Sequence, residues 1–253
     1  SIIDGIRLSK AKRLIFKHND INDLEQQLKH AEGGIFIAIE SVYSMDGDEA
    51  PLPEILALAK KHQAHLIVDE AHATGIFGMQ GRGKVNALGL EKEVFASVHT
   101  FGKALGTHGA IVLGSTELRS YLINFARPFI YSTALPLHSL ISIKSAYDIL
   151  SKEEYNLHKI NDLINLFKQS IKDDFIGQLL PSNSPIQSII IPGNTTCRAL
   201  AASLQASGFD VRPILSPTVP VGKERIRICL HTYNTEAEIM ALTTAIQQQF
   251  QEV

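Results

Sequence analysis

Three groups of chemically active side chains each follow a short apolar run in this sequence. The runs span residues 35–39, 65–68 and 94–98, and the polar groups behind them span residues 40–48, 69–72 and 99–103. Nearly continuous apolar runs of this length are typical of strands covered on both faces. Open α/β sheets assemble their ligand sites at the carboxyl ends of such strands. The sequence therefore predicts one site that gathers residues from all three groups.

Asp69 ends an apolar run, so its carboxylate is expected at the mouth of a buried strand. A buried carboxylate needs a cationic partner or it takes up a proton, and a protonated pyridine nitrogen is such a partner. This pairing would keep the ring of pyridoxal phosphate electron-poor, as its chemistry requires. His72 could hydrogen-bond the phenolic oxygen of the same ring. A structural aspartate that caps a turn and an ordinary satisfied histidine remain the alternatives.

Lys103 follows the third run and has small neighbours, Gly102, Ala104 and Gly106, which would let a flat ring and its phosphate approach the backbone. A lysine in such a confined pocket loses solvation, gives up its proton more easily and becomes a Schiff-base nucleophile. Thr100, one helical turn earlier, could give its hydroxyl to the phosphate. The alternative for an isolated lysine is a solvated charge.

Two arginines near the C-terminus, Arg225 and Arg227, share one face of an expected strand. An arginine can bind a carboxylate through two parallel hydrogen bonds, which suits an amino-acid substrate. An ordinary exposed pair is the alternative.

Other motif matches fail on physical grounds. Residues 69–72 also spell the magnesium-binding motif of a helicase family, and residues 78–84 have phosphate-loop spacing. However, Val85 stands where a phosphate loop needs a Ser or Thr for magnesium, and there is no basic stripe for nucleic acid. No HExxH or similar spacing connects the histidines, and residues 46–48 lack the later ligands of a calcium loop. We expect no metal, and a tight turn at 46–48.

Bulk composition favours a small-molecule substrate. With 253 residues, 45% of them hydrophobic, the chain can bury a large core. Its net charge of −2 creates no long-range electrostatic field that would attract nucleic acid or an anionic membrane.

The two cysteines, Cys197 and Cys229, lack paired spacing and are expected to be unpaired core thiols in a reducing compartment. No apolar run approaches the roughly 20 residues needed to span a bilayer, and no signal pattern opens the chain. A cytoplasmic location is expected.

The elements that must position these residues follow from hydrophobic periodicity. The three apolar runs alternate with helical patterns, as in βαβ units, and a fourth run at 110–113 is expected to join the same sheet. The apolar spacing of residues 117–172 predicts mostly helix. After Pro181, patterns typical of strands and helices alternate. The predicted fold is α/β, with a mostly parallel sheet flanked by helices. It comprises a large domain at 1–150, a bridging helix at 151–180 and a smaller C-terminal α+β domain at 181–253.

Taken together, these segments resemble the α-oxoamine synthases, which are fold-type I pyridoxal-phosphate enzymes. The resemblance covers nearly the whole chain and is carried, in the family's order and spacing, by the motifs at residues 43–48, 69–72, 81–83, 100–103 and 131–133. Residues 131–136 are most similar to the biotin-pathway branch, which condenses alanine with a pimeloyl thioester. The glycine acetyltransferase branch tends toward Phe-Ser-Asn there.

The resemblance implies roles for single residues around the cofactor. Lys103 would carry it as a Schiff base and move protons, and Asp69 would pair with its pyridinium nitrogen. His72 and Ser44 would bond near the phenolic oxygen. Thr100 matches the threonine that binds the phosphate.

Two further positions concern the partner subunit and the substrate. Thr133 matches a residue that reaches the phosphate of the neighbouring subunit's cofactor, which implies a homodimer with shared active sites. Arg227 best matches the arginine that holds the substrate carboxylate, and Arg225 is a nearby possibility.

The implied reaction joins an amino acid, alanine, to an acyl thioester on coenzyme A or a carrier protein, with loss of carbon dioxide. A glycine C-acetyltransferase, a sphingoid-base synthase and a catalytically silent fragment that acts as an assembly partner are the alternatives. Family members are longer, and the segment before Ser1 normally supplies a glycine-containing phosphate loop and the histidine that stacks on the ring. The large domain is therefore expected to be N-terminally incomplete.

Overall fold

The chain divides into two compact units in the computed structural model, which describes residues 1–152, 157–171 and 178–251. The N-terminal unit comprises Ser1–Ser41 and Ala50–Lys152, and the C-terminal unit comprises Val42–Glu49 and Glu153–Val253. Residues 42–49 thus belong with the end of the chain by their contacts. The order of the sequence does not indicate this assignment.

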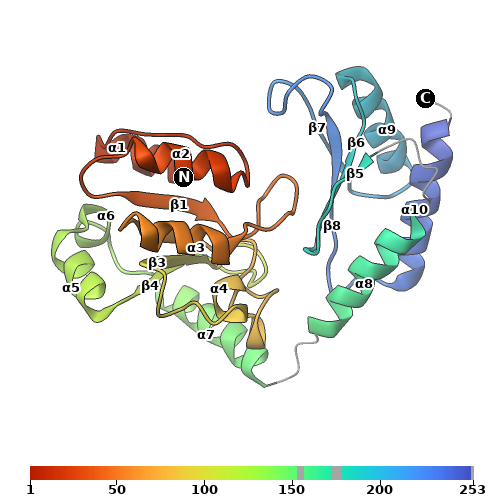
Figure 1. Ribbon diagram of the computed structural model, residues 1–253. Helices are drawn as coiled ribbons and strands as arrows, with labels where there is room; N and C mark the ends of the chain where they lie inside the picture. Colours follow the sequence, from red (N-terminus) through yellow and green to blue (C-terminus); the bar gives the residue numbers. More distant parts are fainter. Residues whose placement is uncertain (153–156, 172–177, 252–253) are drawn as a thin grey trace. The chain divides into compact units, whose positions relative to one another are not determined.

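Four strands of the N-terminal unit form one sheet in the order β1-β2-β3-β4. The strands β1, β3 and β4 are labelled in Figure 1. The strands β1 (Phe36–Glu40), β2 (His65–Asp69) and β3 (Ala96–Thr100) are parallel, and β4 (Ala110–Gly114) pairs antiparallel with β3. The expected strands, including the fourth, are confirmed. Because the last residues of β1 and β2 pair with each other, the carboxyl ends of the parallel strands lie at one edge of the sheet.

Helices of the N-terminal unit cover this sheet to different extents. The helix α3 (Leu52–Lys61) joins β1 to β2 and packs on β2, and α2 (Ile21–Lys29) packs on α3. The connection from β2 to β3 holds two short helical turns, η1 (Met79–Gly81) and α4 (Lys84–Ala87). The remaining helices are α1 (Ile2–Ser9), α5 (Thr116–Phe125), α6 (Arg127–Ile130) and α7 (Leu137–Ser151). Across the described ranges, no helix is long and apolar enough to cross a membrane.

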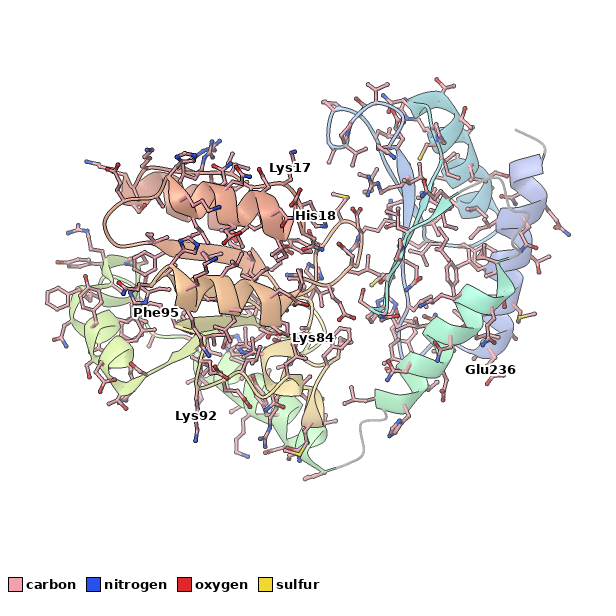
Figure 2. The ribbon with its side chains drawn as sticks, in the orientation of Figure 1. Lys17, His18, Lys84, Lys92, Phe95 and Glu236 are labelled. Carbon is pink, nitrogen blue, oxygen red and sulfur yellow. The ribbon has the colours of Figure 1, made fainter. Side chains whose placement is uncertain are left out.

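Aromatic rings gather at the amino ends of the parallel strands. The ring of Phe95, labelled in Figure 2, lies 4.6 Å from that of His65 and 5.6 Å from that of Phe36, measured between ring centroids. His65 and Phe36 are the first residues of β2 and β1. Ring contacts thus gather at the amino edge of the sheet, whereas Asp69 and Thr100 end their strands at the carboxyl edge.

The C-terminal unit is built on an antiparallel sheet with strand order β5-β6-β8-β7. The helices α8, α9 and α10 lie along one side of it (Figure 1), and its core gathers fully buried side chains such as Phe167, Leu204 and Ile226. This arrangement confirms the α+β architecture expected there. The elements are α8 (Leu157–Ser170), β5 (Gln178–Leu179), β6 (Ile186–Ile190), α9 (Asn194–Ala206), β7 (Arg212–Ile214), β8 (Arg225–Cys229) and α10 (Glu236–Gln251).

The helical segment expected to bridge the domains is described in part. Four apolar side chains of α8 are buried in the core of the C-terminal unit: Ile160, Leu163, Ile164 and Phe167. Residues 153–156 and 172–177 lie outside the described residues. The domain boundaries near 150 and 181 stay a prediction.

Both cysteines are free, as expected, but their surroundings differ. Cys197 lies in the core, and burial raises the pKa of its thiol to about 11. Cys229 is exposed, so the expectation of a core thiol was wrong there. The reason is the alternation of β8, which turns Ile226 and Ile228 into the core and Cys229 toward the other face.

Candidate active site

Asp69 and His72 lie where the sequence places them, at the carboxyl edge of the N-terminal sheet. Asp69 is the last residue of β2, and its Oδ1 accepts a hydrogen bond of 2.8 Å from the backbone N–H of Ala71. This bond fixes the turn that carries His72, and both side chains are half-buried. The capping interpretation of Asp69 therefore accounts for one carboxylate oxygen. For the other, Oδ2, the described residues show no hydrogen bond.

Lys103 lies in the loop that joins β3 to β4. Backbone hydrogen bonds of 2.9 Å, from Phe101 to Gly109 and from Thr107 to Phe101, close this loop as a hairpin. The helical turn expected between Thr100 and Lys103 was therefore wrong. The physical reason is the left-handed backbone of Gly109, with φ of 116°, which favours a turn back into β4.

The confined pocket expected around Lys103 is also absent from the described part of this chain, because the lysine is exposed. Gly75 lies close beneath its loop: a Cβ at this position would stand 2.8 Å from the Cβ of Ala104. The lysine loop thus rests on the backbone of the turn that follows β2, without a side chain between them.

Thr100 ends β3 and has a buried hydroxyl, Oγ1, for which the described residues hold no hydrogen-bond partner. A buried polar group without a partner costs about 1–3 kcal/mol. A ligand that offers an acceptor oxygen would remove this cost. The position thus supports a ligand site at the carboxyl edge of the sheet.

Glu70 organises this edge, although sequence reasoning assigned it no role. Its fully buried carboxylate accepts hydrogen bonds from Ser41 Oγ at 3.1 Å, Lys84 N at 2.8 Å and Val85 N at 2.6 Å (Lys84 is labelled in Figure 2). Burial raises the pKa of this carboxyl, although the three hydrogen bonds favour its charged form. A Cβ at Gly83 would stand 2.7 Å from Glu70 Oε2, which explains the second glycine of the motif at 81–83.

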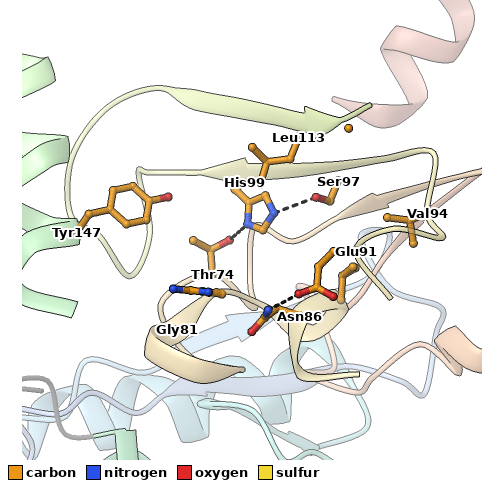
Figure 3. Close-up of a pocket in the computed structure, with 12 residues that line it drawn as sticks. Thr74, Gly81, Asn86, Glu91, Val94, Ser97, His99, Leu113 and Tyr147 are labelled. Carbon is orange, nitrogen blue, oxygen red and sulfur yellow. Dashed lines mark hydrogen bonds between the residues drawn. The ribbon is translucent and has the colours of Figure 1, made fainter. Parts of the chain in front are cut away.

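His99 joins β3 to the turn after β2 (Figure 3). Its Nδ1 lies 2.8 Å from Thr74 Oγ1, and its Nε2 lies 3.0 Å from Ser97 Oγ. Since Thr74 donates its hydroxyl proton to the carbonyl of Glu70, Nδ1 must carry the proton of the imidazole. Burial lowers the pKa of His99, with Asp69 acting in the opposite direction, so the neutral ring is favoured.

A cavity of about 380 Å³ lies beside His99 and is lined also by Arg82. Tyr147 lines the same cavity (Figure 3). None of the residues predicted for the site lines this cavity. Successive residues of a strand face opposite sides, so His99 and Thr100 point away from each other. The cavity is therefore separate from the predicted site.

Ser44 and Arg227 lie together in the C-terminal unit. Arg227 Nε donates a hydrogen bond of 2.9 Å to the backbone carbonyl of Ser44. Ser44 begins the tight turn expected here, which is closed by a hydrogen bond of 2.9 Å from Gly47 N to the carbonyl of Tyr43. The structure thus joins a residue assigned to the cofactor with one assigned to the substrate.

Arg225 has a different role from Arg227. It is 5% exposed and forms an ion pair with Asp46, so the interpretation as an ordinary exposed pair was wrong. Because its charge is already used by a carboxylate of the chain, Arg227 is the better candidate for a substrate carboxylate.

Thr133 lies in the segment between α6 and α7 and is exposed. Large apolar side chains surround it in sequence and are also exposed: Phe129, Tyr131 and Leu137. Within the described part of the N-terminal unit, its hydroxyl takes part in no hydrogen bond that would tie it to the edge residues.

Residues 1–246 match the family described as Aminotransferase class I and II, and the chain belongs to this family. It is 43% identical to the 8-amino-7-oxononanoate synthase of Emericella nidulans over 96% of this chain and 64% of that protein. It is 39% identical to the protein of the same name from Marinobacter nauticus over 97% of this chain and 62% of that protein. The chain thus spans less than two thirds of the length of these relatives.

Solved structures agree with this placement. An 8-amino-7-oxononanoate synthase from Francisella tularensis is 31% identical, with a TM-score of 0.82 over 99% of this chain and 72% of that one. A serine palmitoyltransferase from S. paucimobilis, described with a bound PLP–myriocin aldimine, is 27% identical, with a TM-score of 0.92 over 99% of this chain and 64% of that one. The resemblance to the α-oxoamine synthases and the fold-type I fold are confirmed.

Proposed function

We propose that this chain is the larger part of an 8-amino-7-oxononanoate synthase. The enzyme would use pyridoxal phosphate to condense alanine with pimeloyl-CoA, releasing coenzyme A and carbon dioxide, in biotin biosynthesis. The relatives with the higher sequence identity carry this name. The serine palmitoyltransferase, at 27% identity, supports the shared fold and the cofactor class more than a shared substrate.

The buried hydroxyl of Thr100 is the observation that carries the cofactor assignment. It lies three residues before Lys103, at the same sheet edge as Asp69, and its Oγ1 suits a phosphate oxygen. The three side chains offer a phosphate donor, a primary amine for an aldehyde and a carboxylate for a ring nitrogen. These are the groups that pyridoxal phosphate requires, so the residues fit it.

When bound, pyridoxal phosphate supplies an electron-poor ring that stabilises negative charge on the α-carbon of the amino acid. Asp69 would keep the ring nitrogen protonated, and His72 and Ser44 would hydrogen-bond the phenolic oxygen. Lys103 Nζ would hold the cofactor at rest and, as a free amine, remove the proton from the α-carbon of alanine.

Arg227 would bind the carboxylate of alanine. Because its Nε is engaged by the carbonyl of Ser44, the edge formed by the two Nη atoms is the one available for two parallel hydrogen bonds. The acyl thioester would then approach an α-carbon whose orientation is set by this arginine.

We further propose a cytoplasmic homodimer with shared active sites. Phe129, Tyr131 and Leu137 are 66%, 74% and 71% exposed and flank Thr133, the residue assigned to the partner's cofactor. Large apolar side chains exposed together are typical of an interface. Light scattering on the complete protein should give the mass of a dimer, and a monomer would contradict the proposal.

The decisive test is an absorbance spectrum of the complete protein with pyridoxal phosphate, before and after alanine is added. We expect a visible band from cofactor bound through lysine, and we expect alanine to shift it. Lys103→Ala should abolish the band and lower turnover by at least about 100-fold, because both the attachment point and the general base are lost.

The matched control is Lys92→Ala, which removes an exposed lysine of the loop before β3 and should keep the band. A normal band or normal turnover in Lys103→Ala would refute the assignment. Measuring chain 1–253 beside the complete protein tests the silent-fragment alternative, since that alternative predicts no band from this chain.

A further inference from the structure

Residues 44–47 form a turn that is held by side chains of the C-terminal sheet. Arg227 Nε donates to the carbonyl of Ser44 at 2.9 Å, and Ser188 Oγ donates to the carbonyl of Met45 at 2.9 Å. Ser182 Oγ lies 2.8 Å from the carbonyl of Gly47 and also 2.8 Å from that of Ile186, so its single proton serves one of them at a time. Two adjacent backbone carbonyls of the turn are therefore bound by side chains that come from far along the chain, and a third lies within reach of a hydroxyl.

The remaining residue of this turn, Asp46, is held through its side chain. Its carboxylate pairs with Arg225, whose Nε also donates to the carbonyl of Lys223 at 3.0 Å. Arg225 is 5% exposed. Polar contacts shielded from water are stronger than exposed ones, so the pair fixes the turn firmly.

The sheet explains why these side chains act together. Ser188 on β6 and Arg227 on β8 are directly paired in the antiparallel register. Ile226 and Ile228 face the core, so Arg225 and Arg227 face the opposite side of the sheet. One face of the sheet therefore presents the arginines and a serine to the turn at 44–47.

We infer that Ser188 and Asp46 are positioning residues that orient Arg227 and Ser44 as one rigid element. The guanidinium plane of Arg227 is set by the carbonyl of Ser44, and that carbonyl is set by the neighbouring bonds to Met45 and Asp46. The inference rests on the proposed function, in which Arg227 binds the substrate carboxylate and Ser44 the cofactor. Binding of both ligands then depends on side chains that touch neither.

The test uses the complete protein with pyridoxal phosphate and the variants Ser188→Ala and Asp46→Asn. Dissociation constants for alanine and for the cofactor are measured by spectral titration, and melting temperatures are recorded. Ser188→Ala should weaken alanine binding about five-fold, the effect of one hydrogen bond, and weaken cofactor binding in the same direction. KM for alanine should rise more than kcat falls.

A matched control is Thr243→Val, which removes another buried hydroxyl of the same unit, bonded at 3.1 Å to the carbonyl of Ile239 in α10. It should lower the melting temperature without changing either dissociation constant. In an Arg227→Lys background, Ser188→Ala should have little further effect on alanine binding, because it acts through the arginine.

Different outcomes separate the two proposals. Ser188→Ala is the milder variant, since Asp46→Asn leaves a buried arginine without its partner and could prevent folding. If Ser188→Ala lowers the melting temperature but leaves both dissociation constants within about two-fold, the turn is purely structural and this inference is overturned. If the unmodified complete protein binds neither ligand, the proposed function fails and the inference fails with it.

Discussion

The apolar strands β4 and β6 have opposite surroundings. All five residues of β6 are buried, whereas all five residues of β4 are exposed, with Ile111, Val112 and Leu113 between 42% and 47% exposed. A continuous apolar run is typical of a strand covered on both faces. The C-terminal unit covers β6 with its own residues. The apolar sequence of β4 instead implies a cover that the described residues of this chain do not supply.

The same contrast extends to the helices. The apolar side chains of α8 line a closed core, whereas those of α7 are largely exposed, with Leu140 at 48% and Ile149 at 50%. Hydrophobic periodicity thus reports which face is apolar, but it does not say what covers that face. The proposed homodimer is consistent with this exposed surface.

Truncating one apolar side chain in each unit should give the largest difference in the loss of stability. Phe167→Ala is expected to destabilise the C-terminal unit by about 3–5 kcal/mol, because it empties a fully buried site. Leu113→Ala in β4 should change the stability of chain 1–253 by no more than about 0.5 kcal/mol. Urea unfolding followed by hydrogen exchange of peptides from each unit measures both effects.

Measuring Leu113→Ala in the complete protein as well tests whether β4 is covered there. If further polypeptide or a second copy covers β4 there, Leu113→Ala should cost about 2 kcal/mol or more in the assembled protein. An equal, small effect in both forms would contradict the idea that β4 is covered.

Glu70→Gln should have an intermediate effect, and one that depends on pH. The substitution leaves a backbone N–H donor without an acceptor and should cost about 1–3 kcal/mol at low pH. Because folding raises the pKa of Glu70, its contribution is fully present below the unfolded value and is lost as pH rises through the folded value. The advantage of the unmodified chain over the variant should therefore shrink as pH rises. Urea unfolding of both proteins at a series of pH values measures this difference in stability. A difference that grows as pH rises would contradict the prediction.

His99→Gln should give the smallest effect, with the opposite dependence on pH. Folding lowers the pKa of His99, so its contribution is present above the unfolded value, near 6.5, and is lost as pH falls through the folded value. The unmodified chain should lose stability relative to the variant below about pH 6.5, with a slope of at most about 1.4 kcal/mol per pH unit. Parallel stability curves for the two proteins would show that the histidine is not buried as described.

Part of the candidate site could be predicted from the sequence. Asp69 directly follows one apolar run and Thr100 lies two residues after another, and parallel strands bring such positions to one edge of a sheet, so their placement follows from local pattern and topology. The segment from Thr100 to Lys103 is a hairpin loop and not a helical turn, and Lys103 is exposed in the described part of this chain. The exposure of a loop residue depends on segments far away in sequence, which local pattern does not report.

Glu70 shows what local pattern cannot predict. A second carboxylate directly after a buried strand was a usable signal, but its partners, Ser41, Lys84 and Val85, lie 29, 14 and 15 residues away. Its role emerges only when the turn after β2 folds back on itself.

The sequence by itself determined the strands, the edge at which the reactive side chains gather and the family to which the chain belongs, because these depend on short patterns and motif order. Only the tertiary structure decided that the turn at 44–47 belongs to the C-terminal unit. Arg227 and Ser44 are 183 residues apart, and nothing in either local segment specifies the other. Their contact exists because β8 turns its isoleucines into the core and thereby presents its arginines to the turn.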